Sequence, residues 1–376
     1  MKTVLEWFSL KNTPGIGNHL IKKLIDRFHS PEHISSASVE ELTRIKGISH
    51  PIALAIKQKK ITDPEKQELD AALKKGIRMI TMADETYPPL LHHIPDPPPV
   101  LYVLGNLKKA SINMAVVGSR NATRYGITTA KQLSRDLAHY GLSIVSGMAR
   151  GIDAAAHTGA LEVRNGHTVA VLGSGMDVIY PTENRSLFQK ITESGAVITE
   201  FPLGTRPEPY HFPLRNRIIC GMSVGTIVVE AAMKSGSLIT AKLAADQGRE
   251  VFAVPGSIRS NKSAGAHSLL KQGAKLVENA DDIIEEILPF LQNVECNPEI
   301  PESRLQKKQP MLDSDETIVF KALESYPVHI DDIVRSTGVE PGKLAGILLK
   351  LELEGMATQL PGKYFSCCEE STCQNL

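Results

Sequence analysis

Two short stretches of the chain hold residues suited to binding a negatively charged group. The first, Gly118-Ser119-Arg120, follows the apolar run Met114–Val117 and precedes a helical pattern that begins near Tyr125. Backbone N–H groups at such a strand-to-helix turn favour an anion, and the arginine can bind a phosphate through two parallel hydrogen bonds. Taken alone, the tripeptide is better explained as an ordinary turn with a solvated arginine, because short glycine motifs often occur by chance.

The second stretch is His211-Phe-Pro-Leu-Arg-Asn-Arg217, in which two arginines flank an asparagine. Its pattern predicts a helix that begins about Leu214. Arg215 and Asn216 would then lie in the first turn, where free N–H groups and the helix dipole favour an anion. Arg217 follows on a different face of that helix. Because Gly-Ser-Arg is expected at the same edge of the molecule, we interpret these residues as contacts to phosphate.

Several of these residues also have a structural explanation. An arginine of the second stretch could instead pair with Glu200 or Glu208. Phe212 could stack on a nucleobase, a contact that tolerates any sequence, or it could pack in the core. Asp153 and His157 share a helix face, but no third metal ligand is visible, and a helix cap with a hydrogen-bonded histidine behind it explains them better.

Residues 106–290 alternate short apolar runs with helical patterns, as βαβ units do. This region therefore predicts an α/β fold with a Rossmann-like, doubly wound parallel sheet. The expected strands are Ile112–Val117, Leu142–Val145, Thr168–Leu172, Ala196–Thr199, Thr226–Val229 and Val251–Val254, with Lys275–Val277 as a candidate seventh. The expected helices include Tyr125–Tyr140, Ile152–Glu162, Glu183–Glu193, Arg215–Met222 and Leu238–Gln247.

Small residues follow four of these strands. The turns are Gly118-Ser119, Ser146-Gly147, Gly173-Ser174-Gly175 and Pro255-Gly256-Ser257. Because parallel strands end at the same edge of a sheet, these turns should lie side by side where open α/β sheets bind ligands. Together they predict a glycine-lined rim with many free backbone donors.

Further regions flank the predicted sheet. Residues 1–80 predict short helices with two glycine turns, at 13–17 and 45–49, that are typical of a helix-hairpin-helix module. Such turns can present N–H groups to a phosphate, although a compact helical module without a ligand is an equal alternative. Residues 81–105 are dense in proline and predict a stiff, extended connector. The remaining regions are a linker at 291–310, a winged-helix module at 311–366 and a tail at 367–376.

The formal net charge of zero conceals an uneven distribution. Residues 1–80 hold 14 Lys and Arg against 9 Asp and Glu, and residues 106–290 hold 20 against 16. Residues 311–366 hold 5 against 9, so a polyanion is expected on the first two regions. The acidic winged helix offers only Lys343 and Lys350 on its expected recognition helix, which favours protein contact or plain structural support over DNA binding.

Catalytic, metal and membrane functions find little support in the chain. Neither Gly-x-Ser-x-Gly nor the P-loop pattern occurs, and no Gly-x-Gly-x-x-Gly opens the first βα unit. Donors are plentiful but no nucleophile with a base is visible, so we predict a binding protein without enzymatic activity, cofactor or metal. The tail cysteines Cys367, Cys368 and Cys373 lack a zinc-site spacing. Because no apolar signal run follows Met1, all five cysteines, which include Cys220 and Cys296, are expected to be reduced thiols of a cytoplasmic protein. No apolar run long enough to span a membrane occurs.

The motifs of residues 84–290 resemble, in order and spacing, those of the DNA-processing protein A (DprA, also called Smf) family. The helical and winged-helix modules are similar to common additions in that family. The matching segments are Val117–Arg120 with Tyr125-Gly126; Ser146–Asp153 with Ala156-His157; Val171–Asp177 with Tyr180-Pro181 and Glu183-Asn184; Phe212–Arg217; Ser235–Thr240; and Val254–Ser257.

The resemblance implies a protein that binds single-stranded DNA, protects incoming strands during natural transformation and helps to load the strand-exchange recombinase. It also implies a homodimer formed through the Rossmann-like domain. Some members carry a lysine just before His-Phe-Pro, where this chain has Glu208, Pro209 and Tyr210. The implied nucleic-acid-binding residues are Gly118, Ser119, Arg120, Ser146, Gly147, Gly173, Ser174, Phe212, Arg215, Asn216 and Arg217, with the three arginines on phosphates.

Two other functions stay open. A nucleotide phosphoribohydrolase could use Glu230 as its acid, but Gly221–Thr226 lacks the glycine pair that precedes the acid in those enzymes. A protein–protein adaptor is the second alternative, indicated by the acidic winged-helix module.

Overall fold

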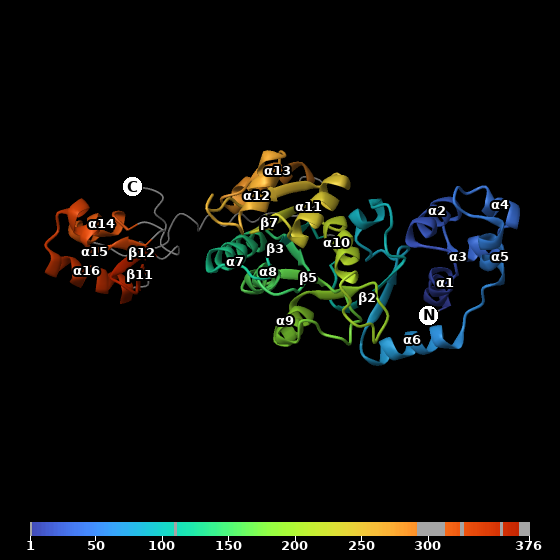
Figure 1. The fold of residues 1–376 in the computed structure, drawn as a ribbon. Coiled ribbons are helices and arrows are strands. Elements are labelled where there is room, and N and C mark those ends of the chain that lie inside the picture. The colour runs from blue at the N-terminus through green and yellow to red at the C-terminus, as the bar shows by residue number, and fades with distance from the viewer. Residues whose placement is uncertain (1, 109–110, 292–312, 324–326, 354–355, 368–376) are drawn as a thin grey trace. The chain divides into compact units, whose positions relative to one another are not determined.

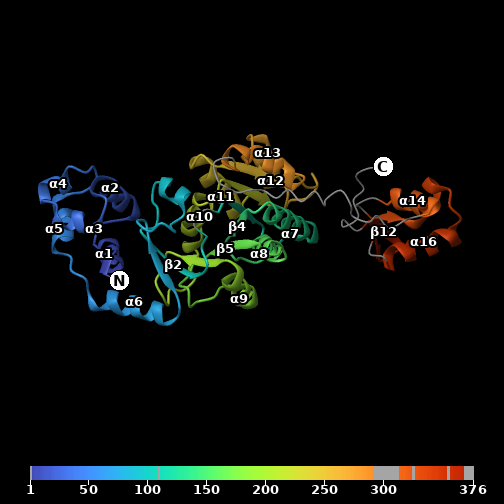
Figure 2. The ribbon, with the colours of Figure 1, turned by 180° about the vertical axis from the view of Figure 1, so that it is seen from behind.

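The computed structural model describes residues 2–108, 111–291, 313–323, 327–353 and 356–367. The chain forms two compact units, residues 1–300 and 301–376, and the linker predicted at 291–310 lies almost wholly outside the described residues. Figure 1 follows the first unit from the N-terminal helices into the large sheet, and Figure 2 shows it from behind. No helix among the described residues is long and apolar enough to cross a membrane.

A nine-stranded sheet in the order β1-β2-β6-β5-β4-β3-β7-β8-β9 forms the centre of the first unit. All the pairings from β6 through β9 are parallel, and only β1–β2 and β2–β6 are antiparallel. This order confirms the predicted doubly wound sheet. Its strands are β1 (Arg78–Thr81), β2 (Val100–Gly105), β3 (Asn113–Gly118), β4 (Ser143–Ser146), β5 (His167–Val171), β6 (Ala196–Thr199), β7 (Gly225–Val229), β8 (Glu250–Ala253) and β9 (Lys275–Leu276).

Both faces of this sheet are covered, because alternate residues of a strand point in opposite directions. In β3, Met114 and Val116 join an apolar cluster with helices that include α7 and α8. Ala115 and Val117 join a second cluster on the other face, with α9 and α10. The helices of this region are α7 (Arg124–His139), α8 (Ile152–Leu161), α9 (Arg185–Ser194), α10 (His211–Gly221), α11 (Gly236–Asp246), α12 (Ala264–Lys271) and α13 (Ala280–Leu291), with the short 3-10 helices η1 (Pro89–His93) and η2 (Thr182–Asn184).

Short helices at the N-terminus share the second apolar cluster with the sheet. Trp7 and Leu24 are fully buried in the same cluster as Tyr102 and Ile198. The Tyr102 hydroxyl also donates a 2.8 Å hydrogen bond to Glu68. The N-terminal module and the sheet therefore have one continuous core. Its helices are α1 (Lys2–Lys11), α2 (Asn18–Phe28), α3 (Pro31–Ser36), α4 (Val39–Thr43), α5 (His50–Gln58) and α6 (Asp63–Lys74).

The second unit contains three helices and a small antiparallel sheet among its described residues, as the winged-helix outline predicts. Leu344, Leu348 and Ile333 are buried in its own apolar core. Its elements are α14 (Ser314–Lys321), β10 (Val328–His329), α15 (Ile330–Thr337), α16 (Pro341–Leu353), β11 (Ala357–Leu360) and β12 (Tyr364–Cys367).

The proline-rich segment corrects one expectation. Residues 81–105 are not merely a connector, because β2 pairs with β6 and extends the sheet. The prolines end at Pro99, and the six residues of β2 that follow contain none, so every ladder N–H is present.

The start of α10 corrects a second expectation. The helix begins at His211 rather than at Leu214, with Pro213 inside its first turn, where its missing N–H costs no hydrogen bond. Arg215 and Asn216 consequently lie beyond the first turn. The dipole argument for an anion contact at these two residues is therefore wrong.

The turn at the end of β3 has room for glycine only, which gives a stability test. A Cβ at Gly118 would lie 1.9 Å from the carbonyl oxygen of Val229 and 2.6 Å from Cγ1 of Ile152. Gly118→Ala should lower the free energy of unfolding by about 2–3 kcal/mol through overpacking, measured by urea denaturation. At Gly236 a Cβ meets nothing within 4 Å, so Gly236→Ala should stay within about 0.5 kcal/mol of wild type. Equal losses in both variants would contradict the packing argument.

Candidate nucleic-acid interface

The residues predicted from the strand ends do lie at one edge of the sheet, because β3, β4 and β5 are parallel neighbours. Their exposure differs widely. Arg120 is exposed, and Gly118, Ser119, Phe212 and Asn216 are half-buried. The others are buried: Ser146, Gly147, Gly173, Ser174, Arg215 and Arg217.

Many of the backbone donors on this rim already have partners inside the protein. The Ser119 N–H donates to the Glu230 carbonyl at 2.8 Å. The N–H groups of Gly147 and Ala149 donate to Oδ2 of Asp153 at 3.2 and 3.3 Å. The expectation that the N–H groups of Ser119 and Gly147 are free donors is therefore wrong.

The two buried serines of the rim make internal contacts as well. Ser146 Oγ donates to the Val116 carbonyl at 2.6 Å, and Ser174 Oγ donates to the Val178 carbonyl at 2.7 Å. These hydroxyls tie neighbouring backbone segments together beneath the surface. In this conformation they stabilise the rim from within.

The rim glycines make room for side chains of α10. A Cβ at Gly147 would lie 1.8 Å from Nη1 of Arg215, and one at Gly173 would lie 3.0 Å from the Phe212 ring. A strand-end glycine is commonly interpreted as space for a ligand. Here that space is filled by the protein's own guanidinium and aromatic ring.

Arg215 is buried directly beneath the rim. Its Nη1 donates a 2.6 Å hydrogen bond to the Val171 carbonyl, and its side chain lies near the carboxylate of Asp153. Burial lowers the pKa of Arg215 to about 10, which leaves the guanidinium protonated at neutral pH. Burial also raises the pKa of the Asp153 carboxyl, against the opposing effect of Arg215. This buried pair holds α10 against the turns after β4 and β5.

His157 lies behind that pair, as its spacing from Asp153 suggested. Its Nδ1 donates to the Thr168 hydroxyl at 2.7 Å, since that hydroxyl itself donates to the Ile144 carbonyl. Burial, helped by the nearby positive charge of Arg215, lowers the pKa of His157 to about 3. The imidazole is therefore neutral at physiological pH. No group of three or more potential metal ligands occurs among the described residues, and Cys368 and Cys373 lie outside them.

Arg217 has protein partners on the far side of α10. Its guanidinium forms a buried ion pair with Glu200, and its Nε lies 3.2 Å from Oδ2 of Asp96. Its Nη1 also donates to the Asp96 carbonyl at 2.7 Å. The structure thus places Arg217 in the internal pairing with Glu200 that was the alternative to phosphate contact.

Arg120 is different from both of these arginines. Its Cζ lies 4.8 Å from the centroid of the Phe212 ring, a cation–π geometry. No carboxylate among the residues that the structure describes forms an ion pair with Arg120, whereas the exposed Arg150 pairs with Glu183. Arg120 is therefore a cation held in place by an aromatic face and open to solvent.

Tyr180 belongs to this cluster and was not among the predicted site residues. Its ring lies 5.9 Å from the Phe212 ring, and 45% of the side chain is exposed. The sequence did offer a signal for this residue, because Tyr180-Pro181 accompanies the segment Val171–Asp177 among the motifs that resemble the family. Its contact with Phe212 depends on how the loop after β5 folds, and spacing along the chain does not determine that.

Glu230 follows β7 and acts as a structural carboxylate. It accepts the Thr123 N–H at 2.8 Å and also the Thr123 hydroxyl. Thr123 is the N-cap of α7, so the carboxylate stabilises the start of that helix. These contacts give Glu230 a structural role at this edge of the sheet.

The buried neutral imidazole predicts a specific pH dependence. Because the folded pKa of His157 lies below its unfolded value of about 6.5, the unfolded chain binds the extra proton, and stability falls as the pH falls. From pH 7 to pH 4 this group should remove about 3 kcal/mol. In His157→Asn that loss should be absent from urea-unfolding curves measured across this range. Parallel pH profiles for the two proteins would contradict a buried neutral histidine.

Known proteins share this architecture. A model of the DNA recombination-mediator protein A family matches residues 78–288. A DprA winged helix domain matches residues 303–363, and a SAM-like helix-hairpin-helix tandem matches residues 9–59. The Smf protein of Synechocystis is 34% identical over 95% of this chain and 96% of its own length.

Two solved structures are also similar. The X-ray structure of DNA processing protein A from Streptococcus pneumoniae has a TM-score of 0.63 and 36% identity, covering 75% of this chain and 97% of that one. The protein from Helicobacter pylori, whose structure describes a single-stranded DNA binding mode, has a TM-score of 0.51 and 31% identity, covering 57% and 97%. The chain therefore belongs to the DNA recombination-mediator protein A (DprA/Smf) family.

Proposed function

We propose that this protein binds single-stranded DNA along the carboxyl edge of its large sheet, with Arg120 as the principal phosphate contact. The observation that carries this proposal is the exposed guanidinium of Arg120, which lies over the Phe212 ring and forms no ion pair with a carboxylate among the described residues. The family relative from Helicobacter pylori, for which a single-stranded DNA binding mode is described, supports the same ligand. Such binding should tolerate any sequence, because phosphates carry no base identity.

The other predicted site residues take supporting roles in this proposal. Gly118 and Ser119 directly precede Arg120 in the chain and are half-buried, as is Asn216 on α10. In the proposal these three residues lie at or near the bound DNA strand. Arg215 and Arg217 add positive potential but shape the site chiefly through Val171 and Glu200. The buried layer beneath the proposed site contains Ser146, Gly147, Gly173 and Ser174.

Aromatic rings add a surface for bases. Phe212 supports Arg120 on one side and contacts the exposed Tyr180 on another. Stacking on an aromatic side chain contributes about 1–3 kcal/mol per base and does not depend on sequence. A strand that places a phosphate on Arg120 can therefore stack a neighbouring base here.

The protein acts without catalysis in this proposal. The carboxylate best placed for an acid, Glu230, is engaged by the cap of α7. This engagement argues against the phosphoribohydrolase alternative. We infer a cytoplasmic protein that protects incoming strands in natural transformation and helps to load the strand-exchange recombinase.

A homodimer through the Rossmann-like domain completes the proposal. Met233 follows β7 and Ile258 follows β8, two paired strands, and these side chains are 60% and 91% exposed. Both side chains belong to loops at the carboxyl ends of these strands, and we propose that they contribute to the dimer interface.

A protein-contact role is favoured for the winged-helix unit. Lys343 forms an ion pair with Asp315, and Lys350 pairs with Glu316. The two lysines of α16 that could face a groove are thus largely neutralised. The unit therefore suits a protein partner better than DNA.

Arg120→Ala tests the phosphate contact. Affinity for a 30-nucleotide single strand should fall for every sequence alike, and the slope of log K against log salt should flatten by about 0.7, the value for one phosphate. Fluorescence anisotropy across a salt series measures both quantities. Arg164→Ala is the matched control, because this exposed arginine lies in the turn before β5, at the opposite edge. Unchanged affinity and slope in Arg120→Ala would refute the proposed site.

Deletion of residues 311–376 tests whether DNA binding and recombinase loading depend on different units of the chain. Affinity for single strands should stay within about twofold of wild type, since every proposed DNA contact lies in the first unit. Recombinase loading onto protected strands, measured by strand exchange, should fall. A truncated protein that loses strand binding would instead place part of the DNA site in the winged-helix unit.

A further inference from the structure

The loop after β8, residues 254–263, lies against the turn that carries Arg120. The Lys262 ammonium donates a 2.7 Å hydrogen bond to the carbonyl of Asn121, the residue that follows Arg120. The Tyr125 hydroxyl donates to the Pro255 carbonyl at 3.0 Å and ties the start of the same loop to α7. The loop therefore reaches across the end of β7, which lies between β3 and β8 in the sheet.

Lys262 can still bind an anion in this position. An ammonium has three N–H donors, so the hydrogen bond to Asn121 leaves two of them available. That partner is a neutral carbonyl, and within the described parts of the chain Lys262 forms no ion pair with a carboxylate. The side chain is also half-buried, so its surroundings restrict where the ammonium can move. A second positive charge is thus held beside Arg120 without a counter-charge.

The charges of the carboxyl edge are divided unevenly along the sheet. The loops after β3, β7 and β8 are residues 119–123, 230–235 and 254–263, and they hold four Lys and Arg against one carboxylate. The cations are Arg120, Lys234, Arg259 and Lys262, and the carboxylate is Glu230. Glu230 is only 5% exposed and accepts hydrogen bonds from Thr123. This half of the edge therefore attracts a polyanion.

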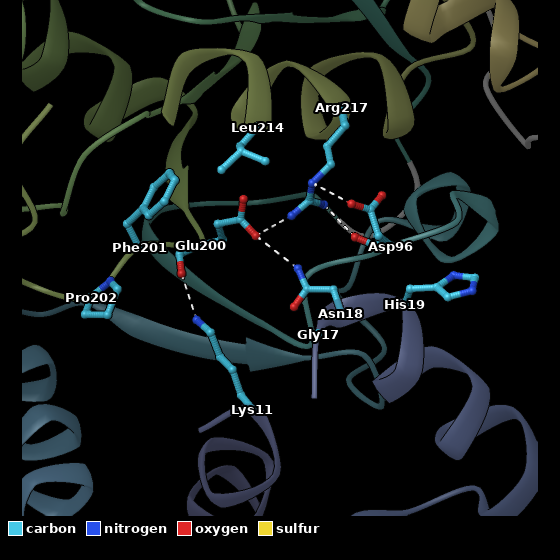
Figure 3. A pocket seen from close by; sticks show the side chains of 10 residues that line it. All are labelled: Lys11, Gly17, Asn18, His19, Asp96, Glu200, Phe201, Pro202, Leu214 and Arg217. Carbon is cyan, nitrogen blue, oxygen red and sulfur yellow. Dashed lines mark hydrogen bonds and ion pairs between the residues drawn. The ribbon is translucent and has the colours of Figure 1, made fainter. Parts of the chain in front are cut away.

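The loops after β4, β5 and β6 have the opposite balance. Residues 147–151, 172–184 and 200–210 hold two arginines against four carboxylates, which are Arg150 and Arg206 against Asp177, Glu183, Glu200 and Glu208. Two cations from other elements are already engaged there. Figure 3 shows Arg217 between Glu200 and Asp96, and Lys11 donating to the Glu200 carbonyl. This half of the edge offers a phosphate backbone more repulsion than attraction.

We propose that Lys262 is a second phosphate contact for the bound single strand, which runs from Phe212 past Arg120 toward the loop after β8. The Phe212 ring lies against Gly173, which follows β5, on one side of β3. Strand β8 lies on the other side, two strand spacings or about 10 Å from β3. A base can then stack on Phe212 while neighbouring phosphates lie on Arg120 and Lys262. This inference rests on the proposed function and adds a contact and a direction to it.

Lys262→Gln tests the contact, because the amide can still donate to the Asn121 carbonyl but carries no charge. For a 30-nucleotide single strand, the slope of log K against log salt should flatten by about 0.7, which corresponds to about fivefold weaker binding at 0.1 M salt. Combined with Arg120→Ala, the slope should flatten by about 1.4. Lys262→Arg keeps the charge and should retain the wild-type slope. Fluorescence anisotropy with the full-length protein across a salt series measures all four proteins.

Arg206→Gln is the control for the direction of the strand. This exposed arginine lies in the loop after β6, in the half of the edge that the strand does not enter. Its removal should therefore leave the slope at the wild-type value. Circular dichroism and size-exclusion chromatography check that each variant keeps the fold and the oligomeric state of the wild type.

The possible outcomes separate this inference from the proposed function. An unchanged slope in Lys262→Gln, beside a flattened slope in Arg120→Ala, would overturn the inference and leave the proposed function intact. Weaker binding of Lys262→Gln with the wild-type slope would overturn it as well, because the lysine would then act only by placing the loop. Equal flattening in Arg206→Gln would overturn the direction of the strand. No flattening in Arg120→Ala would refute the proposed function instead.

Discussion

The buried guanidinium of Arg215 is the contact on which the carboxyl edge depends. It comes from α10, lies against Gly147, donates to the end of β5 and faces the carboxylate of Asp153. That carboxylate in turn accepts two N–H groups of the turn after β4. Removing one member of such a pair leaves a buried charge without compensation, which is strongly destabilising. Helix α10 is thereby fixed to two strand ends at once.

The position of α10 determines what the surface offers. Because Arg215 and Arg217 anchor the helix from two sides, Phe212 in its first turn faces the rim. Phe212 then supports Arg120, which comes from a different strand. The proposed site therefore consists of α10, which the buried Arg215 and Arg217 hold in place, and of the exposed Arg120, which Phe212 of that helix orients.

Much of the fold follows from local pattern. The run Ala196–Thr199 forms β6 with the predicted bounds, because a short buried strand between turn residues has little freedom to shift. Strand β2 was missed because the neighbouring prolines dominate the local composition, although its own six residues contain none. The parts that could not be predicted depend on distant partners. Whether Arg217 meets Glu200 or a phosphate is decided by packing between α10 and β6, and spacing along the chain does not encode it.

A single exposed arginine cannot by itself hold a strand. One charge-assisted hydrogen bond contributes about 1.5–3 kcal/mol, whereas micromolar affinity needs about 8 kcal/mol. The remainder has to come from stacking on Phe212 and Tyr180, from Lys262, or from further copies of the chain. A second copy makes the next contact intramolecular and raises the overall affinity without any new kind of interaction. Arg215 and Arg217, beneath the rim, are already paired with protein groups. The affinity for single-stranded DNA should therefore depend more on the number of nucleotides contacted and on the number of bound protein copies than on the net charge of the domain.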